Sequence, residues 1–218
     1  AHDAWPSRVR QHRSEQVPFE TGSLEDFREA TAEEVAALRE VAHVSSDVFY
    51  PYFALKDRLS QKDPKAVDYK WLVRNTEGTP VGVIAIYELR DQPGLYNIGG
   101  LYLTPEARGT GIALDSINAM YNFATEHIAG FRGFRVRVSE LNYPSRRLME
   151  KLRWVPTDVA EGDYALVVEG KEQRTNTIVY EFGTDATERI DLGRDDRLLS
   201  IEEVRAQHRE LSKKEVGR

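Results

Sequence analysis

The stretch Asn97-Ile-Gly-Gly-Leu-Tyr-Leu-Thr-Pro-Glu-Ala-Arg-Gly-Thr-Gly-Ile-Ala113 decides the fold of this chain. Its first half is rich in β-forming side chains and stops at Thr104-Pro105, because proline cannot donate a hydrogen bond to a sheet. From Ile112 onward, apolar residues recur three and four positions apart, which is typical of one helical face: Leu114, Ile117, Tyr121, Ala124 and Ile128. The sequence therefore predicts a strand, a glycine-containing loop and a helix over 112–129.

The loop between this strand and helix has the composition of an anion-binding site. The first N–H groups of a helix have no partner within the helix and carry the positive end of its dipole. Gly109 and Gly111 allow an anion to approach the backbone, and Arg108 adds a positive charge. Residues 108–113 are therefore a candidate pyrophosphate cradle, and a plain surface loop is the alternative.

A second segment follows the predicted helix. The sequence predicts a strand over 134–139, then a turn and a short helix that is opened by Pro144. Leu148 and Leu152 form the expected buried stripe of this helix. Ser145 precedes Leu148 by three residues, so its side chain is expected on the same, inward side.

Together the two segments resemble the GNAT acetyltransferase superfamily and, in motif, its ribosomal-protein N-terminal acetyltransferase branch. The resemblance rests on R-x-x-G-x-A at Arg108, Gly111 and Ala113, followed about thirty residues later by N-x-x-S-x-x-L-x-x-K-L from Asn142 to Leu152. It implies an α/β fold with a mixed, mostly antiparallel central sheet flanked by helices. It also implies acetyl-CoA as a cosubstrate.

The resemblance further implies positions for the cosubstrate. Leu101, Tyr102 and Leu103 would contact the pantetheine arm, and the N–H of Leu103 would polarise the thioester carbonyl. Asn142 and Ser145 would flank the acetyl group and the sulfur. The pyrophosphate would be held by the loop and the helix start, which comprise Arg108, Gly109, Thr110, Gly111, Ile112 and Ala113.

Two catalytic positions match the family less closely: the acid that protonates the departing thiolate and the base that deprotonates the amine. Many relatives carry a tyrosine four residues after the Ser145 position, and this chain has Met149 there. Ser145 is therefore the candidate acid, with a hydrogen bond to a helix-start N–H as its alternative role. Arg137 stands where some relatives have a glutamate. Glu140 and Glu88 remain as candidate bases, with solvated surface roles or deprotonation through water as alternatives.

Composition limits the remaining choices. The chain has 218 residues, 40% of them hydrophobic, which is enough for one domain with extensions. The absence of cysteine excludes disulfides, cysteine zinc sites and a cysteine nucleophile. A net charge of −6 argues against a nucleic-acid partner and suits an amine substrate. No apolar run is long enough to span a membrane, so we expect a cytoplasmic protein without a membrane partner.

The N-terminal half supplies further elements. Residues 1–16 are expected to form a flexible arm, and a first strand is predicted from Val17 to Leu24. A capping box at Thr31 and Glu34 opens a predicted helix whose inward residues are Val35, Leu38 and Ala42. Segment 44–60 is rich in aromatic residues and is expected to form a second helix or lid. The resemblance implies that it borders the acceptor, with Asp47 or Tyr50 near the amine, and filling of the core under a helix is the alternative.

Hairpins complete the predicted domain. Strands over 69–73 and 81–89 are joined by a turn, and a final hairpin pairs Asp163–Val168 with Asn176–Phe182 around residues 169–174. Beyond it, Ser200 and Glu203 would cap a helix in a charged tail. His43 and His127 lack partners at ligand or triad spacing, so neither supports a metal site or histidine catalysis.

The sequence thus predicts a GNAT acetyltransferase domain over 17–182, between the arm and a C-terminal extension over 183–218. We expect direct transfer of an acetyl group from acetyl-CoA to a primary amine, which is a small molecule, a peptide N-terminus or a lysine. Transfer of a longer acyl group, which a wide channel at Gly99 and Gly100 would permit, is one alternative. A non-catalytic acyl-CoA sensor or scaffold is another, and a homodimer is an open possibility.

Overall fold

The computed structural model of this chain describes residues 16–46, 49, 59, 68–183 and 200–206. In this described part there are two compact units, one that ends at Phe131 and one that begins at Arg132. The strand pairs recorded within each unit are antiparallel, and helices accompany them, so the predicted α/β class is confirmed. The described residues include no helix that is both long enough and apolar enough to cross a bilayer.

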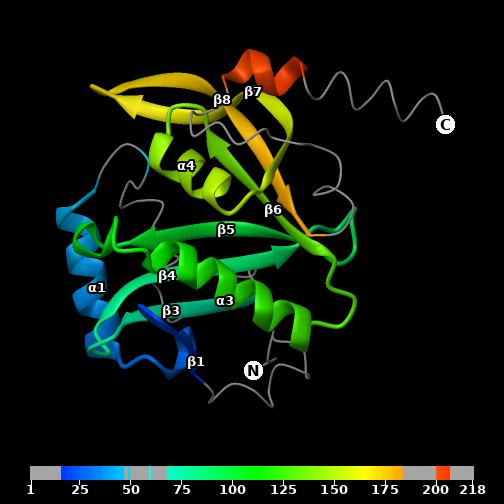
Figure 1. Ribbon diagram of the computed structural model, residues 1–218. Helices are drawn as coiled ribbons and strands as arrows, with labels where there is room; N and C mark the ends of the chain where they lie inside the picture. Colours follow the sequence, from blue (N-terminus) through cyan, green and yellow to red (C-terminus); the bar gives the residue numbers. More distant parts are fainter. Residues whose placement is uncertain (1–15, 47–48, 50–58, 60–67, 184–199, 207–218) are drawn as a thin grey trace. The chain divides into compact units, whose positions relative to one another are not determined.

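The described part of the first unit contains a five-stranded sheet in the order β1-β2-β3-β4-β5 (Figure 1). The predicted single strand from Val17 to Leu24 is wrong, because a turn at Glu20 and Thr21 folds these residues into a hairpin. The predicted hairpin of β3 and β4 is confirmed. The strands are β1 (Val17–Phe19), β2 (Gly22–Asp26), β3 (Tyr69–Asn75), β4 (Pro80–Glu88) and β5 (Leu95–Leu103).

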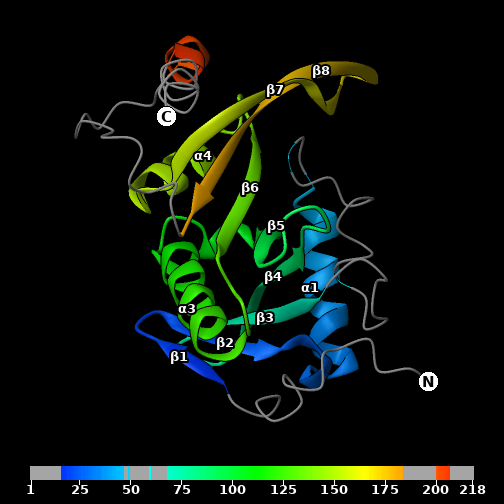
Figure 2. The ribbon, with the colours of Figure 1, turned by 90° about the vertical axis from the view of Figure 1, so that its right-hand side faces the viewer.

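Two helices, α1 (Ala32–Val44) and α3 (Ile112–His127), lie on opposite faces of this sheet (Figure 2). On the α3 face, the rings of Trp71 and Phe123 meet edge to face with their centroids 5.4 Å apart. A short 3-10 helix, η2 (Phe27–Glu29), precedes α1. As predicted, α1 turns Val35, Leu38 and Ala42 inward, and they share a core with Phe27, Ala30, Leu59, Leu72, Val83 and Tyr102.

The buried face of α3 is broader than the predicted stripe. Leu114 and Tyr121 are only half-buried. Ser116 lies inside because its hydroxyl donates a hydrogen bond to the carbonyl oxygen of Ile112 at 2.6 Å. A helix that lies on a sheet covers more than one line of side chains, which a single stripe does not capture. The buried residues of α3 are Ile112, Ser116, Ile117, Ala119, Met120, Phe123 and Ala124.

The capping box predicted at Thr31 and Glu34 opens α1. The N–H of Glu34 donates to the Thr31 hydroxyl at 3.2 Å, and the N–H of Thr31 donates to the Glu34 carboxylate at 3.0 Å. Arg74 of β3 places its Nη1 2.8 Å from the other oxygen of this carboxylate. Hydrogen bonds from Arg74 and from the Thr31 backbone lower the pKa of Glu34.

This pair leads to a prediction about stability and pH. We expect Glu34→Gln to lower the free energy of unfolding by about 1 kcal/mol at neutral pH, since glutamine keeps the cap but loses the ion pair. The pKa of Glu34 is lower in the folded than in the unfolded chain, so this contribution exists above the unfolded value and is lost as pH falls through the folded value. Urea unfolding of the unaltered chain and of Glu34→Gln, at neutral pH and at about pH 3, measures the difference between their free energies of unfolding. This difference should be smaller at about pH 3, and an equal difference at both pH values contradicts the prediction.

The described part of the second unit contains a three-stranded sheet in the order β6-β8-β7 together with helix α4. Its elements are β6 (Gly133–Ser139), α4 (Tyr143–Lys151), β7 (Val155–Val168) and β8 (Lys171–Phe182). The final hairpin is longer than predicted. Its turn is only Glu169 and Gly170, with φ of 52° and 75°, because a tight turn with two left-handed residues matches the twist of paired strands.

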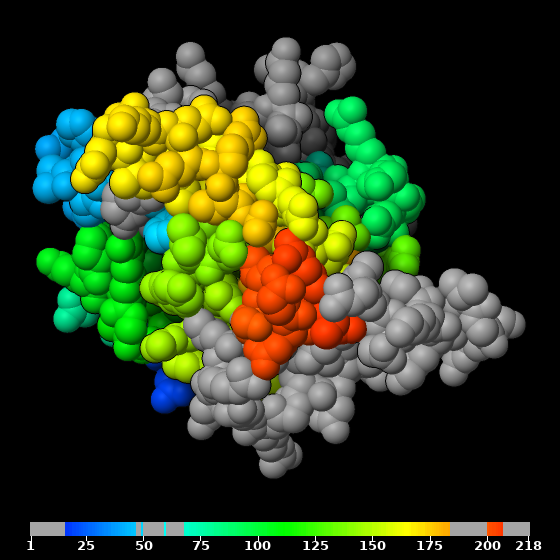
Figure 3. Space-filling model, turned by 90° about the horizontal axis from the view of Figure 1, so that it is seen from above, coloured from blue at the N-terminus to red at the C-terminus, as the bar shows by residue number. Residues whose placement is uncertain are grey.

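A short helix over 201–206 belongs to the same unit. The predicted capping box is present, because the N–H of Ser200 donates to the Glu203 carboxylate at 2.7 Å and the N–H of Glu203 donates to the Ser200 hydroxyl at 3.2 Å. Val204 is buried, and Arg205 pairs with Glu161 of β7 at 2.5 Å. This piece of the C-terminal extension therefore packs against β7 (Figure 3).

Two predictions fall largely outside the described residues. The expected arm over 1–16 is described only at residue 16. Of the aromatic segment 44–60, the described residues are 44–46, 49 and 59, so Asp47 and Tyr50 lie outside them.

Candidate cofactor site

Strand β5 carries a β-bulge at Gly99. Ala85 of β4 pairs with Gly100, and the next residue, Ile86, pairs with Ile98, so Gly99 is the extra residue. The residues on either side of this part of β5 are buried, whereas Gly99, Gly100 and Leu101 are half-buried. The accessible part of the strand therefore coincides with the bulge.

Past the bulge, the register decides which backbone groups of β5 point toward β4. The N–H of Thr104 donates to the carbonyl oxygen of Val81 at 2.8 Å. Hydrogen-bonded pairs alternate in an antiparallel ladder, so Tyr102 also directs its backbone groups at β4. The N–H groups of Leu101 and Leu103 consequently point to the other edge of β5, as a strand that receives an extended ligand arm requires.

A short 3-10 helix, η3 (Pro105–Ala107), leads from β5 into the glycine loop (Figure 1). Arg108 donates from Nε to the carbonyl oxygen of Leu103 at 3.0 Å. The Thr110 hydroxyl donates to the carbonyl oxygen of the last residue of η3 at 2.6 Å. These bonds hold the loop in shape while residues 108–111 remain exposed.

The two glycines of the loop adopt left-handed backbone conformations, with φ of 75° at Gly109 and 88° at Gly111. Among the described residues, a Cβ at Gly109 would meet no atom within 4 Å, and one at Gly111 would meet only the methyl carbon of Thr21, at 4.0 Å. Gly111 is the N-cap of α3 and supplies no side-chain hydrogen bond to the helix. The first N–H groups of α3 thus follow directly on an exposed loop that contains Arg108, an arrangement that fits a diphosphate.

Asn142 and Ser145 are brought together at the start of α4, in the second unit. Asn142 is the N-cap, and its Oδ1 accepts a hydrogen bond from the N–H of Ser145 at 3.3 Å. Asn142 therefore supplies a side-chain cap at this helix start. Met149, at the position of the family's tyrosine, is buried.

The predicted buried stripe of α4 is wrong. Leu148 and Leu152 are half-buried, and the buried side chains of the helix are Arg146 and Met149. Arg146 is accommodated because its Nη1 donates to the carbonyl oxygen of Glu140 at 2.9 Å. Apolar periodicity predicted that the leucines are the buried residues, because it takes no account of polar partners that allow an arginine to be buried.

Glu88, one of the two candidate bases, lies at the exposed end of β4. Its Oε1 accepts a hydrogen bond from the N–H of Gly94 at 2.7 Å, so it stabilises the turn into β5. It pairs with Tyr96, whereas Leu103 pairs with Gly82, six residues away from Glu88 along β4. At about 3.3 Å per residue, Glu88 is about 20 Å from the position of Leu103 along the sheet. The register therefore separates Glu88 from the proposed thioester-polarising N–H.

Glu140, the other candidate base, directly follows β6. Its carboxylate accepts a hydrogen bond from the backbone N–H of Asn176 at 3.1 Å, and the side chain is half-buried. Its position two residues before Asn142 places it on the same turn as the predicted acetyl-binding residues. Within the second unit, the structure thus brings Glu140, Asn142 and Ser145 together.

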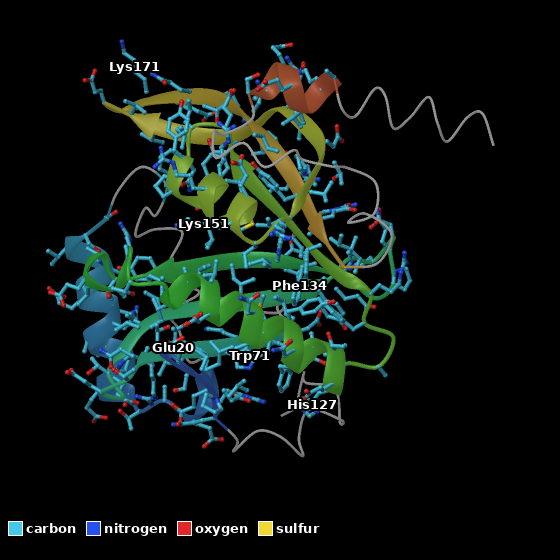
Figure 4. The ribbon with its side chains drawn as sticks, in the orientation of Figure 1. Glu20, Trp71, His127, Phe134, Lys151 and Lys171 are labelled. Carbon is cyan, nitrogen blue, oxygen red and sulfur yellow. The ribbon has the colours of Figure 1, made fainter. Side chains whose placement is uncertain are left out.

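The histidines take no part in these groupings. His127 lies at the C-terminal end of α3, opposite to Gly111, and its ring is 4.8 Å from that of Phe123 (Figure 4). His43 is exposed on α1. In the part of the chain that the structure describes, no three His, Asp or Glu side chains converge in a way that could hold a metal ion.

Sequence reasoning missed two features of the site in the first unit. A glycine pair inside a strand is a signal for a bulge, and Gly99 with Gly100 carried it. The hydroxyl of Thr21 donates to the Asp115 carboxylate at 2.6 Å, across a separation of 94 residues. No local sequence pattern predicts a contact between residues so far apart in the chain.

Comparisons with known proteins agree with this geometry. Residues 17–155 match the family model described as an acetyltransferase (GNAT) domain. No curated protein matches the sequence. A GCN5-related N-acetyltransferase from Brucella melitensis superposes with a TM-score of 0.61 at 14% identity, over 90% of this chain and 95% of that chain.

Two further solved structures share the fold. An acetyltransferase of the GNAT family from Bacillus anthracis has a TM-score of 0.61 at 15% identity, over 78% of this chain and 98% of that chain. A RimL ribosomal L7/L12 alpha-N-protein acetyltransferase in complex with coenzyme A has a TM-score of 0.58 at 16% identity, over 79% of this chain and 99% of that chain. At such identities these structures show a common fold.

Proposed function

Because this chain belongs to the GNAT acetyltransferase family, we propose that it transfers an acetyl group from acetyl-CoA directly to a primary amine within a ternary complex. The chain is an N-acetyltransferase, and acyl-CoA-dependent transfer is the general activity of its family. The observation that carries the proposal is the exposed glycine loop in front of α3, where helix-start N–H groups have no side-chain cap.

The first unit holds the cosubstrate in this proposal. The N–H groups at the start of α3, together with Arg108, bind the pyrophosphate. Leu101 and Leu103 bind the pantetheine arm, supported by the register that turns their N–H groups away from β4. The N–H of Leu103 polarises the thioester carbonyl, a form of stabilisation worth about 3 kcal/mol in comparable sites.

The second unit supplies the residues that handle protons. The amine attacks only as a neutral group, so its proton passes to Glu140 directly or through water. A bond forms between the amine nitrogen and the acetyl carbon, and the bond from that carbon to sulfur breaks. The Ser145 hydroxyl then gives a proton to the departing thiolate and regains one from solvent. The Asn142 cap supports these roles, because it fixes the backbone that carries Ser145.

A pair of variants separates the two candidate bases. We expect Glu140→Gln to lower kcat about tenfold, at the low end for an acid–base residue because water takes over part of the task. Glutamine retains an oxygen that accepts the N–H of Asn176, so the fold should be kept. We expect Glu88→Gln to change kcat by less than about twofold, since this side chain lies at the end of β4 that is about 20 Å from Leu103. Initial rates of thiol release measure both, and the reverse order contradicts the assignment.

Thiol release from acetyl-CoA with matched acceptors tests the proposed function. We suggest a peptide with a free N-terminus, the same peptide with that terminus blocked and a lysine retained, and a polyamine. The peptide N-terminus is our first candidate, because the similar RimL structure is that of an alpha-N-protein acetyltransferase. Initial-rate lines that intersect indicate a ternary complex, and parallel lines contradict it. Tight binding without turnover assigns a sensor instead, and faster turnover of a longer acyl-CoA assigns a longer acyl donor.

A further inference from the structure

The turn between β1 and β2 lies against the start of α3. The Thr21 hydroxyl donates to the Asp115 carboxylate at 2.6 Å, and the Thr21 methyl carbon would lie 4.0 Å from a Cβ at Gly111. One short side chain thus lies beside the glycine loop and contacts the acidic residue in the first turn of the helix.

Asp115 is an unexpected neighbour for an anion. Its N–H donates to the carbonyl oxygen of Gly111 at 3.1 Å, so it lies one helical turn from Gly111, on the same face. Side chains on a helix lean toward its N-terminus, and the helix dipole attracts a carboxylate there. An unrestrained Asp115 would therefore lean toward the N–H groups that the proposed function gives to the pyrophosphate, and its charge would repel that group.

We propose that Thr21 is a positioning residue for the cosubstrate. By donating its hydroxyl to Asp115, it holds this carboxylate at the side of the loop, so that the helix-start N–H groups stay available to the diphosphate. This inference rests on the proposed function, since it concerns the same loop. It adds a determinant from a hairpin that the sequence motifs of the loop do not include.

The test is calorimetry with coenzyme A on the full chain. Thr21→Val keeps the shape of the side chain and removes the donor, and we expect the Kd to rise about fivefold, as for a like charge released near a bound anion. Thr21→Ser keeps the donor and should bind within about twofold of the unaltered chain. Thr125→Val is the control on the same helix, because the Thr125 hydroxyl donates to the carbonyl oxygen of Tyr121, away from the loop.

A second substitution separates positioning from a merely structural contact. If Asp115 is the repelling group, Thr21→Val combined with Asp115→Asn restores the Kd to within about twofold, although the hydrogen bond is still missing. The fivefold effect of Thr21→Val should also shrink as salt is raised to about 0.5 M, because salt screens the repulsion. Thermal unfolding of every variant confirms that it is folded.

The outcomes are distinguishable. A Thr21→Val protein that binds like the unaltered chain, or a double variant that binds no better than Thr21→Val, overturns the role of Thr21 and leaves the proposed function intact. Failure of the unaltered chain to bind coenzyme A overturns the proposed function, and the role of Thr21 with it.

Discussion

Replacing Gly111 with valine is expected to weaken the binding of coenzyme A about 100-fold. Gly111 has a φ of 88°, a conformation that a β-branched side chain adopts only with strain. Its new side chain would also project toward Thr21 and into the space in front of α3. Relief of the strain requires the loop to move, and the helix-start N–H groups would then no longer converge on the diphosphate.

Gly78 offers a matched control for this substitution. It has a φ of 80° in the turn between β3 and β4, and among the described residues a Cβ there meets nothing within 4 Å. Gly78→Val should therefore impose a similar backbone strain in a turn outside the loop. Calorimetry should find normal coenzyme A binding for Gly78→Val and the large loss only for Gly111→Val. Equal losses would show that general destabilisation, rather than the loop, is responsible.

The largest effect on stability is expected at Trp154. Its indole is 1% exposed and stacks between two rings of the second unit, with centroids 6.0 Å from Phe134 and 5.7 Å from Phe182. Trp154→Ala would leave a cavity flanked by both rings. We expect it to lower the free energy of unfolding by about 4 kcal/mol, within the range for large aromatic residues in cores.

A comparison on the neighbouring strand makes this result specific. Val167 of β7 is 55% exposed, so Val167→Ala should cost less than about 0.5 kcal/mol. Urea unfolding followed by circular dichroism measures both variants. A loss below about 1 kcal/mol for Trp154→Ala would contradict the stacked core of the second unit.

The central features of the first unit were readable from the sequence because their signals are local. The strand through Leu103, its stop at Thr104-Pro105 and the helix from Ile112 follow from residues within a few positions of one another. The capping boxes of Thr31 and Ser200 are equally local. Such patterns fix element type and start without knowledge of the partner surfaces.

Features that depend on partners were not predicted. The hairpin of β1 and β2 was predicted as one strand, although Gly22 has no room for a side chain against the carbonyl oxygen of Arg74. The place of Arg146 inside the second unit depends on a carbonyl acceptor, and the contact of Thr21 with Asp115 depends on tertiary packing. Polar partners and long-range contacts are decided by packing, which apolar periodicity does not report.

The most direct measurement of the central claim is an NMR titration of the isotope-labelled chain with coenzyme A. The claim is that the N–H groups at the start of α3 bind the diphosphate. It predicts that the largest amide shifts fall on Gly109, Gly111, Ile112 and Ala113, and that pantetheine, which lacks the diphosphate, leaves these four amides in place. Saturation with coenzyme A without shifts at these amides would contradict the account.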